Sequence, residues 1–169
     1  MAKRNLPIGI EFYKKVIDEA YFYVDKTLII KELLDRQSYV NLFTRPRRFG
    51  KTLALDMLKT FFEDEIDEKG NAVDNSRYFA DKKIMDAGNQ YIQHMGRYPV
   101  IYLSFKSSKQ ADWDTTFWMI KKQIAEEYIR HQYVLQTDDL LEVEKNLYRS
   151  IMSLADDNKI YVDAISFLS

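Results

Sequence analysis

The chain has 169 residues, a formal net charge of −1 and no cysteine. This length accommodates one domain with a buried core, the near-neutral charge excludes a global attraction to nucleic acid or anionic membranes, and the lack of cysteine excludes disulfides and thiolate metal sites. The sequence contains no N-terminal apolar leader and no run of 18 apolar residues, so we expect a cytoplasmic protein without a membrane partner.

The first predicted elements lie on either side of Asp25. Residues 21–24, YFYV, form a short aromatic run that is typical of a strand or an extended segment. Apolar pairs four residues apart within residues 28–34 predict a helix from about 26 to 36, with Asp25 as its cap.

Residues 44–52, which read TRPRRFGKT, indicate a phosphate-binding loop. The general pattern, G-x-x-x-x-G-K-[ST], requires backbone N–H groups that face the phosphates, a Lys on the β- and γ-oxygens and a hydroxyl on Mg²⁺. The GKT at residues 50–52 supplies the second half of this pattern. Arg45 stands at the position of the first Gly, and Pro46 has no N–H, so the loop is a variant.

The elements around this loop fit a phosphate site. Such a loop leaves a buried strand and enters a helix whose N–H groups and positive dipole end face the anion. Residues 39–43, YVNLF, predict the strand, and periodic apolar residues from Ala54 to Phe62 predict the helix. The alternative is a basic turn before an ordinary core helix. We favour an anion site because a Lys in the first helical turn opposes the dipole, and the cations of residues 45–48 repel one another.

The next segments alternate between loop, helix and strand patterns. Residues 63–76 are mostly acidic and polar and predict a surface loop, and residues 79–95 are helical in parts. Residues 99–105, PVIYLSF, form the strongest strand pattern in the chain. Because a helical crossover leads to this near-continuous apolar strand, we predict an α/β fold with a parallel sheet covered by helices on both faces.

Two further helices are predicted after this strand. Apolar residues at helical spacing place them over about 113–130 and about 140–154. Asp112 and Asp114 are predicted to cap the first of these helices, because a carboxylate there accepts backbone N–H groups.

One later segment has the pattern of a Walker B strand. Residues 160–164, IYVDA, form an apolar run that ends in Asp163. This run is short, however, and Tyr161, Ala164, Ile165 and Leu168 fall at helical spacing. We therefore favour a helix, and on this interpretation the chain has no catalytic acid.

Four segments carry a resemblance to a known family. They are Leu6-Pro7-Ile8-Gly9, Tyr23-Val24-Asp25-Lys26-Thr27, the segment FTRPRRFGKT from Phe43 and the segment YPVIYLSF from Tyr98. In their order and spacing they resemble the predicted AAA-ATPase-like family of bacterial proteins, over essentially the whole chain. That family typically writes its loop R-P-R-R-F-G-K-[ST], so the variant loop is what the resemblance leads us to expect.

The resemblance implies a P-loop NTPase-like parallel sheet flanked by helices, in a single truncated domain over residues 1–169 without a clear Walker B element. It implies ATP and Mg²⁺ as cofactors, with Lys51 on the β- and γ-phosphates and Thr52 on the metal ion. Residues 21–23 or 25–27 would contact the base or ribose. The nucleotide-binding residues that it implies are Arg47, Arg48, Phe49, Gly50, Lys51, Thr52 and Leu53.

Members of the family usually continue into a Walker B strand and often into a C-terminal domain that resembles PD-(D/E)XK nucleases. We therefore expect this chain to be the N-terminal portion of a longer protein. The resemblance implies a nucleoside triphosphatase, in which Arg47 or Arg48 would support the charge of the transition state, but the missing acid leaves hydrolysis by this chain open.

The sequence thus predicts an ATP-binding domain of an ATPase-like protein, with two alternatives. The first is a non-hydrolysing module that uses nucleotide as a switch or serves for interaction, which the missing acid favours. The second is a nucleic-acid clamp, because four cations within residues 45–51 attract any phosphate. The near-neutral charge counts against the clamp, so nucleic acid is expected as a partner only through the full-length protein. The choice between ATP and GTP and the oligomeric state stay open.

Overall fold

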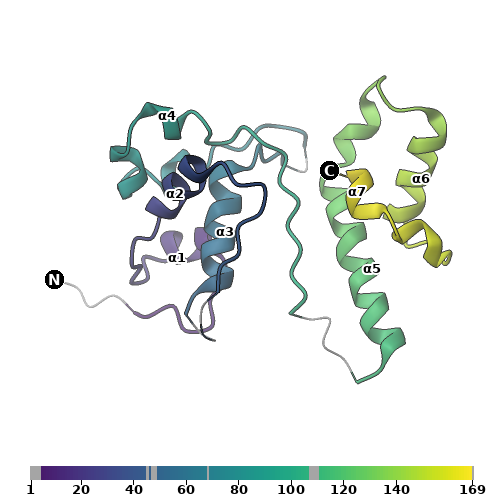
Figure 1. Cartoon of the computed structure of the whole chain (residues 1–169), viewed down its shortest axis with the longest axis horizontal. Coiled ribbons are helices and arrows are strands. Elements are labelled where there is room, and N and C mark those ends of the chain that lie inside the picture. Colours follow the sequence, from purple (N-terminus) through teal and green to yellow (C-terminus); the bar gives the residue numbers. More distant parts are fainter. Residues whose placement is uncertain (1–4, 45, 47–48, 68, 107–110, 169) are drawn as a thin grey trace. The chain divides into compact units, whose positions relative to one another are not determined.

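The computed structural model describes residues 5–44, 46, 49–67, 69–106 and 111–168. These residues form helices joined by irregular segments, and the chain divides into two units, Met1–Val100 and Ile101–Ser169 (Figure 1). Each unit has a hydrophobic core of its own. Within the described ranges, no helix has both the length and the apolar character needed to cross a membrane.

The first unit contains three helices of six residues or more among its described residues. The predicted helix after Asp25 and the predicted helix after the loop are both confirmed, as α2 and α3, whereas the sequence pattern did not indicate α1. The predicted cap of α2 is wrong, because α2 begins at Leu28 and its N-cap residue is Thr27 rather than Asp25. Residues 79–95, which were predicted to be helical in parts, contain short helical turns. The elements are α1 (Tyr13–Asp18), α2 (Leu28–Arg36), α3 (Lys51–Phe62), the 3-10 turns η1 (Ser76–Tyr78) and η2 (Lys83–Asp86), and α4 (Asn89–Ile92).

Helix α3 is held against α1 by aromatic packing. Tyr13, Phe61 and Phe79 are fully buried, and the ring of Phe79 lies 5.3 Å from that of Tyr13 and 5.2 Å from that of Phe61. Each such side chain contributes about 1.5 to 3 kcal/mol on burial. The carboxylate of Asp56 on α3 also accepts the backbone N–H of Tyr13 at 2.6 Å. These contacts fix α3, and with it the residues at its start, against α1.

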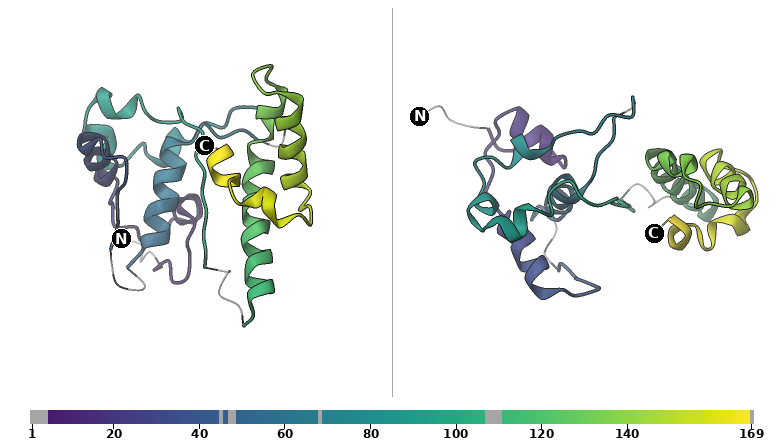
Figure 2. Two further views of the ribbon diagram at one scale, coloured as in Figure 1. Left: turned by 45° about the vertical axis from the view of Figure 1, so that its right-hand side comes forward. Right: turned by 90° about the horizontal axis from the view of Figure 1, so that it is seen from above.

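The second unit is built on a pair of helices. Helices α5 (Trp113–Arg130) and α6 (Glu142–Met152) lie side by side and run in opposite directions (Figure 2), which confirms both predicted helices. Asp112 caps α5, because its Oδ1 accepts the N–H of Thr115 at 2.8 Å. The shorter elements are η3 (Gln132–Gln136), η4 (Asn158–Tyr161) and α7 (Ala164–Leu168).

Two buried tyrosines join the helices of this unit. The rings of Tyr128 and Tyr148 lie 4.5 Å apart, and the hydroxyl of Tyr148 donates to the carbonyl oxygen of Tyr128 at 2.9 Å. The hydroxyl of Tyr128 in turn donates to the carbonyl oxygen of Ala164 at 2.6 Å. Burial raises the pKa of both tyrosines, that of Tyr128 to about 12, so both hydroxyls keep their protons well above neutral pH.

The predicted α/β fold with a P-loop NTPase-like parallel sheet is wrong. In the parts of the chain that the structure describes, strand pairing is limited to two isolated bridges, between Glu63 and Tyr98 and between Ile66 and Ala72. Residues 39–43 form no strand, and Tyr39, Val40 and Leu42 are 107%, 84% and 85% exposed. A strand needs a neighbour whose backbone groups pair with its own, and no described segment provides one here. Apolar, β-branched composition alone therefore does not make a strand.

The second predicted strand, residues 99–105, is also wrong, and here the structure shows what replaces the neighbouring strand. The N–H of Tyr102 donates to Glu127 Oε2 at 2.9 Å, and the N–H of Ser104 donates to Gln123 Oε1 at 3.2 Å. Alternate N–H groups of an extended chain point to the same side, and residues four apart share one face of a helix. Side chains of α5 thus satisfy backbone groups that a sheet would otherwise pair.

Candidate functional site

The loop residues enter helix α3 at Gly50. This residue adopts φ 72° and ψ 28°, a left-handed conformation that Gly accepts without steric cost. Its carbonyl oxygen accepts the N–H of Ala54 at 2.9 Å, which is the first hydrogen bond of α3. A helix does not use the N–H groups of its own first turn, so the backbone of residues 51–53 suits a bound anion.

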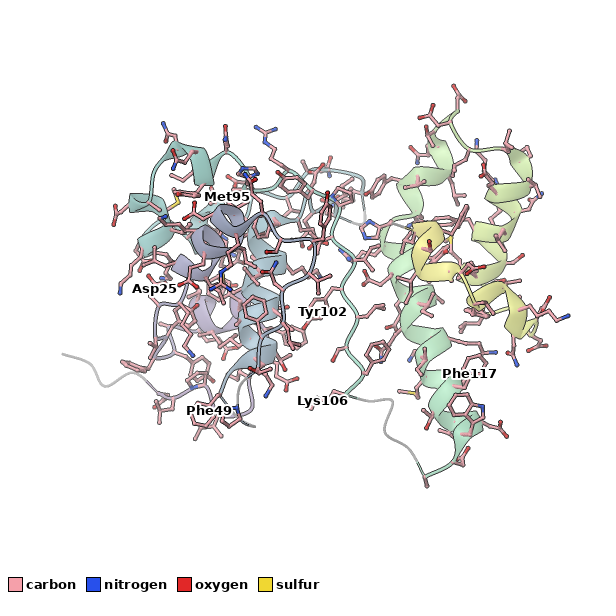
Figure 3. The ribbon with its side chains drawn as sticks, in the orientation of Figure 1. Asp25, Phe49, Met95, Tyr102, Lys106 and Phe117 are labelled. Carbon is pink, nitrogen blue, oxygen red and sulfur yellow. The ribbon has the colours of Figure 1, made fainter. Side chains whose placement is uncertain are left out.

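The side chain of Lys51 turns back on the loop. Its Nζ donates to the carbonyl oxygen of Pro46 at 3.0 Å. Thr52 and Leu53 are half-buried in the first turn of α3, whereas Phe49, labelled in Figure 3, is 59% exposed. Lys51 therefore stands in a position from which its ammonium group reaches the loop backbone rather than the helix core.

A cavity of about 470 Å³ opens beside this loop. Its walls come from α2, from residues 41–43 and from the first two turns of α3. Pockets that bury small molecules commonly measure about 300 to 1,000 Å³, so the volume suits a nucleotide. The lining is mainly apolar with a few polar groups: Lys26, Leu28, Ile29, Glu32, Asn41, Leu42, Phe43, Phe49, Gly50, Lys51, Ala54, Leu55 and Leu58.

A second cavity of about 370 Å³ adjoins the first. It shares Lys26, Phe49, Gly50 and Ala54 with the larger cavity, so the two meet at the start of α3. The remaining lining residues come from the N-terminal segment, from residues 22–24 and from α3: Leu6, Pro7, Phe22, Tyr23, Val24 and Leu53.

The structure brings some of the predicted site residues together. Residues 49–51 all line the larger cavity, and Leu53 lines the adjoining one. Thr52, the predicted Mg²⁺ ligand, is part of the same helical turn but lines neither of these two cavities. Arg47 and Arg48 lie outside the described residues. Lys26 also lines both cavities, although it lies outside the phosphate-loop pattern. The sequence feature that pointed to Lys26 was the family segment YVDKT, residues 23–27.

The other polar residues of YVDKT are engaged inside the fold. Asp25, labelled in Figure 3, accepts the N–H and the hydroxyl of Thr27 with Oδ1, at 2.8 and 2.7 Å, and the N–H of Lys83 with Oδ2, at 2.8 Å. The hydroxyl oxygen of Thr27 accepts the N–H of Ile84 at 3.2 Å. Burial would raise the pKa of Asp25, but the hydrogen bonds from Lys83 and Thr27 hold this pKa below its ordinary value. These bonds tie the start of α2 to η2.

The segment IYVDA forms no strand, and the helix predicted there is confirmed only in part, since Val162 and Asp163 lie in neither helical element. It begins within η4 and ends in α7, and Asp163 lies between these two elements with an exposed side chain. The backbone oxygen of Asp163 accepts the N–H of Phe167 at 2.9 Å, as in the first turn of a helix. Asp163 therefore does not end a strand, and it has none of the setting of a Walker B acid.

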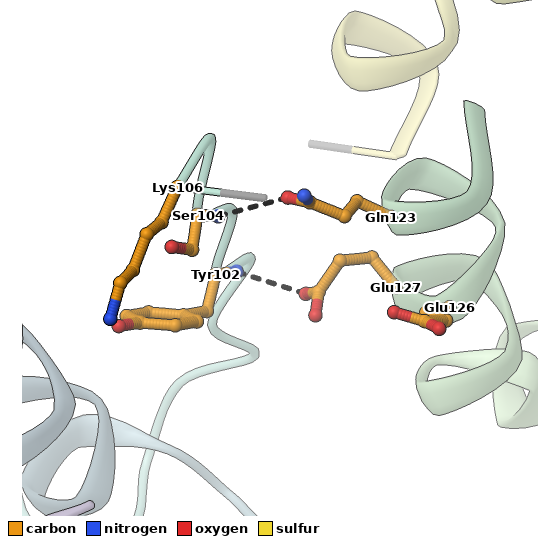
Figure 4. Close-up of a pocket in the computed structure, with 6 residues that line it drawn as sticks. All are labelled: Tyr102, Ser104, Lys106, Gln123, Glu126 and Glu127. Atoms are coloured by element: carbon orange, nitrogen blue, oxygen red, sulfur yellow. Dashed lines mark hydrogen bonds between the residues drawn. The ribbon is translucent and has the colours of Figure 1, made fainter. Parts of the chain in front are cut away.

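A separate cavity of about 540 Å³ lies in the second unit, between residues 102–106 and α5 (Figure 4). Its carboxylates come from Glu126 and Glu127. Glu127 is 8% exposed, accepts the N–H of Tyr102 and forms an ion pair with Arg130. A carboxylate held in this way supports the extended segment, so we assign the cavity a structural role.

Comparison with known proteins agrees with the family resemblance. The chain is 43% identical over 63 residues to an "Uncharacterized protein in vnfD 5'region" of Azotobacter chroococcum mcd 1, an alignment that covers 37% of this chain and 12% of that protein. No solved structure matches the chain. The family described as "Predicted AAA-ATPase" matches residues 7–166. Because this match spans nearly the whole sequence, the chain belongs to the predicted AAA-ATPase family.

Proposed function

We propose that this chain binds ATP with Mg²⁺ at the start of α3, as the nucleotide-binding part of an ATPase. One observation carries the proposal: Gly50 caps α3 in a left-handed conformation, directly before Lys51 and Thr52 and at the edge of a cavity of about 470 Å³. The family of the chain supports the same conclusion. The alignment covers only 12% of the relative from Azotobacter chroococcum. Any activity of a longer protein that contains this chain is therefore also a proposal.

The residues present fit the phosphate groups of a nucleotide. Lys51 Nζ, which donates to the neutral carbonyl of Pro46, would exchange it for β- and γ-phosphate oxygens, because an anionic acceptor adds an attraction between opposite charges that a neutral carbonyl lacks. The first-turn amides of α3 would donate to the same phosphates. The hydroxyl of Thr52 would hold Mg²⁺, and that ion would neutralise phosphate charge.

A non-hydrolysing role is a second candidate for the chain as it stands, and the place of Asp163 favours it. Hydrolysis requires a group that orients water and an acid that helps to hold Mg²⁺. Asp163 lies between η4 and α7 in the second unit. Among the described residues that line the cavity of about 470 Å³ beside the loop, Glu32 is the one carboxylate. We therefore propose nucleotide binding by this chain with turnover close to background.

Thermal unfolding with and without Mg·ATP tests the proposal. Ligand at 100 times its Kd stabilises the native state by about 2.7 kcal/mol, which raises the Tm of a chain of this size by about 5 to 10 °C. The Lys51→Ala variant is expected to lose this shift, whereas Lys69→Ala, at an exposed lysine outside both cavities, should keep it. An equal shift in the Lys51→Ala protein would remove the loop from the site.

A further inference from the structure

Lys26 is brought next to the loop by the tertiary fold. Its Nζ lies 4.0 Å from the position that a Cβ on Gly50 would occupy. Since Gly50 has no Cβ, the ammonium group stands directly over the backbone at the point where the loop becomes α3. Lys26 and Lys51 line the same cavity, although 24 residues separate them in the sequence.

The charges around the cavity of about 470 Å³ beside the loop favour an anion. Its described lining carries two cations, Lys26 and Lys51, and one carboxylate, Glu32. Two ammonium groups that share a cavity repel each other, and a bound anion relieves this repulsion. A polyphosphate, with several negative charges, would bring both cations into favourable contact.

Lys26 differs in its partners from five of the nine lysines that the structure describes in the first unit. Five of those lysines form ion pairs: Lys14 with Glu65, Lys15 with Glu19, Lys31 with Asp35, Lys59 with Glu63, and Lys82 with Asp81. Among the described residues, no carboxylate forms an ion pair with Lys26. Its charge is therefore available to a ligand.

The backbone of Lys26 is held on both sides. Asp25 before it bonds Thr27 and the N–H of Lys83, and Thr27 after it bonds the N–H of Ile84. These hydrogen bonds fix the residues that flank Lys26, so only the Lys26 side chain has to be ordered when a ligand binds. This arrangement lowers the entropic cost of using Lys26 as a binding residue.

We propose that Lys26 binds the polyphosphate of the nucleotide together with Lys51, as a second cation from the segment before α2. The inference rests on the proposed function, and it assigns to Lys26 the phosphate end of the ligand rather than its base. A lysine suits this role because its ammonium group is a compact point charge with three donors.

Calorimetric titration of the chain with ATP, ADP and AMP tests the role of Lys26. In the Lys26→Ala variant, the affinity for ATP should fall about tenfold, a loss that reflects a charge-assisted contact at an exposed position. The affinity for AMP should change less than twofold, because AMP lacks the β- and γ-phosphates. Lys26→Arg should retain most of the ATP affinity, and Lys69→Ala serves as the matched control.

The outcomes separate this inference from the proposed function. If Lys51→Ala loses ATP but Lys26→Ala binds it as the unchanged chain does, the role of Lys26 is refuted and the phosphate loop stands. Equal losses for ATP and AMP in Lys26→Ala would place Lys26 at the base or ribose and also overturn the inference. If the unchanged chain binds no ATP, the proposed function fails and the inference fails with it. The Tm of each unliganded variant, expected within 2 °C of the unchanged chain by the usual size of surface effects, shows that the fold is kept.

Discussion

Lys51 Nζ and the carbonyl oxygen of Pro46 are joined by a hydrogen bond of 3.0 Å. The bond places the positive charge of Lys51 against the backbone of the loop, on the side of α3 where the helix dipole is also positive. A cation at this end of a helix is unfavourable unless an anion binds there. In the proposed function, a phosphate group would replace the carbonyl of Pro46 as the partner of Lys51.

We predict that Thr52→Ala separates nucleotide binding from metal binding. The substitution removes only the hydroxyl proposed to hold Mg²⁺ and leaves Lys51 and the backbone of α3 in place. Binding of ATP should persist, and the gain in affinity on adding Mg²⁺ should largely disappear. Titration of ATP in EDTA and in MgCl₂ measures the difference, with Thr52→Ser as the control that keeps the hydroxyl. A Thr52→Ala protein that responds to Mg²⁺ as strongly as the unchanged chain would exclude Thr52 as the metal ligand.

We predict that Asp25→Ala destabilises the first unit by about 1 to 2 kcal/mol, because the N–H groups of Thr27 and Lys83 lose their acceptor. Asp25→Asn should cost less, since the amide oxygen still accepts one of these bonds. Urea unfolding of the three proteins at pH 7 gives the free energies. If the Asp25→Ala and Asp25→Asn proteins are both as stable as the unchanged chain, the bonds of Asp25 do not anchor α2.

The same residue should give a defined pH dependence. The pKa of Asp25 in the folded chain lies below its ordinary value of 3.8, so the unfolded state binds a proton more readily than the folded state. The stability that Asp25 contributes is complete above pH 3.8 or so and is lost as the pH falls through the lower folded pKa. Between about pH 5 and pH 2, the Asp25→Asn protein should lose less stability than the unchanged chain. Parallel loss in both proteins over this interval would argue against a lowered pKa.

We predict that this chain releases phosphate from ATP at a rate close to background, and that Asp163→Asn does not change the rate. Asp163 is exposed between η4 and α7 rather than at the end of a strand, so it lacks the setting of a Walker B acid. Steady-state phosphate release by the unchanged chain, Asp163→Asn and Lys51→Ala gives the comparison. Turnover of order 1 s⁻¹, near the low end of usual enzyme values, that disappears in Asp163→Asn would show that Asp163 is a catalytic acid.

Helix positions followed from local sequence because a helix satisfies its backbone within one segment. Apolar residues at helical spacing located α3, α5 and α6, because each N–H of an α-helix bonds a carbonyl four residues away. The helix predicted around Asp163 is confirmed only in part, as the short elements η4 and α7. Asp112 as a cap was likewise a local prediction, since its partner is only three residues distant.

Strands could not be assigned in the same way. Residues 39–43 and 99–105 have the apolar, β-rich composition of strands, but a strand exists only if another segment pairs with it. In the structure the first segment is largely exposed, and the second has its N–H groups bound by Gln123 and Glu127. The composition indicated an extended backbone and gave no information on the partner.

The candidate site shows the same difference between local features and contacts that are distant in sequence. The sequence by itself determined the family of the chain and the Gly50-Lys51-Thr52 motif at the start of a helix, because a loop that precedes a helix is a local feature of the chain. Only the tertiary structure decided that Lys26 stands beside Gly50 and that Asp25 and Thr27 serve to anchor it. Contacts between residues far apart in sequence depend on how α2 and α3 pack, and no local spacing encodes that packing.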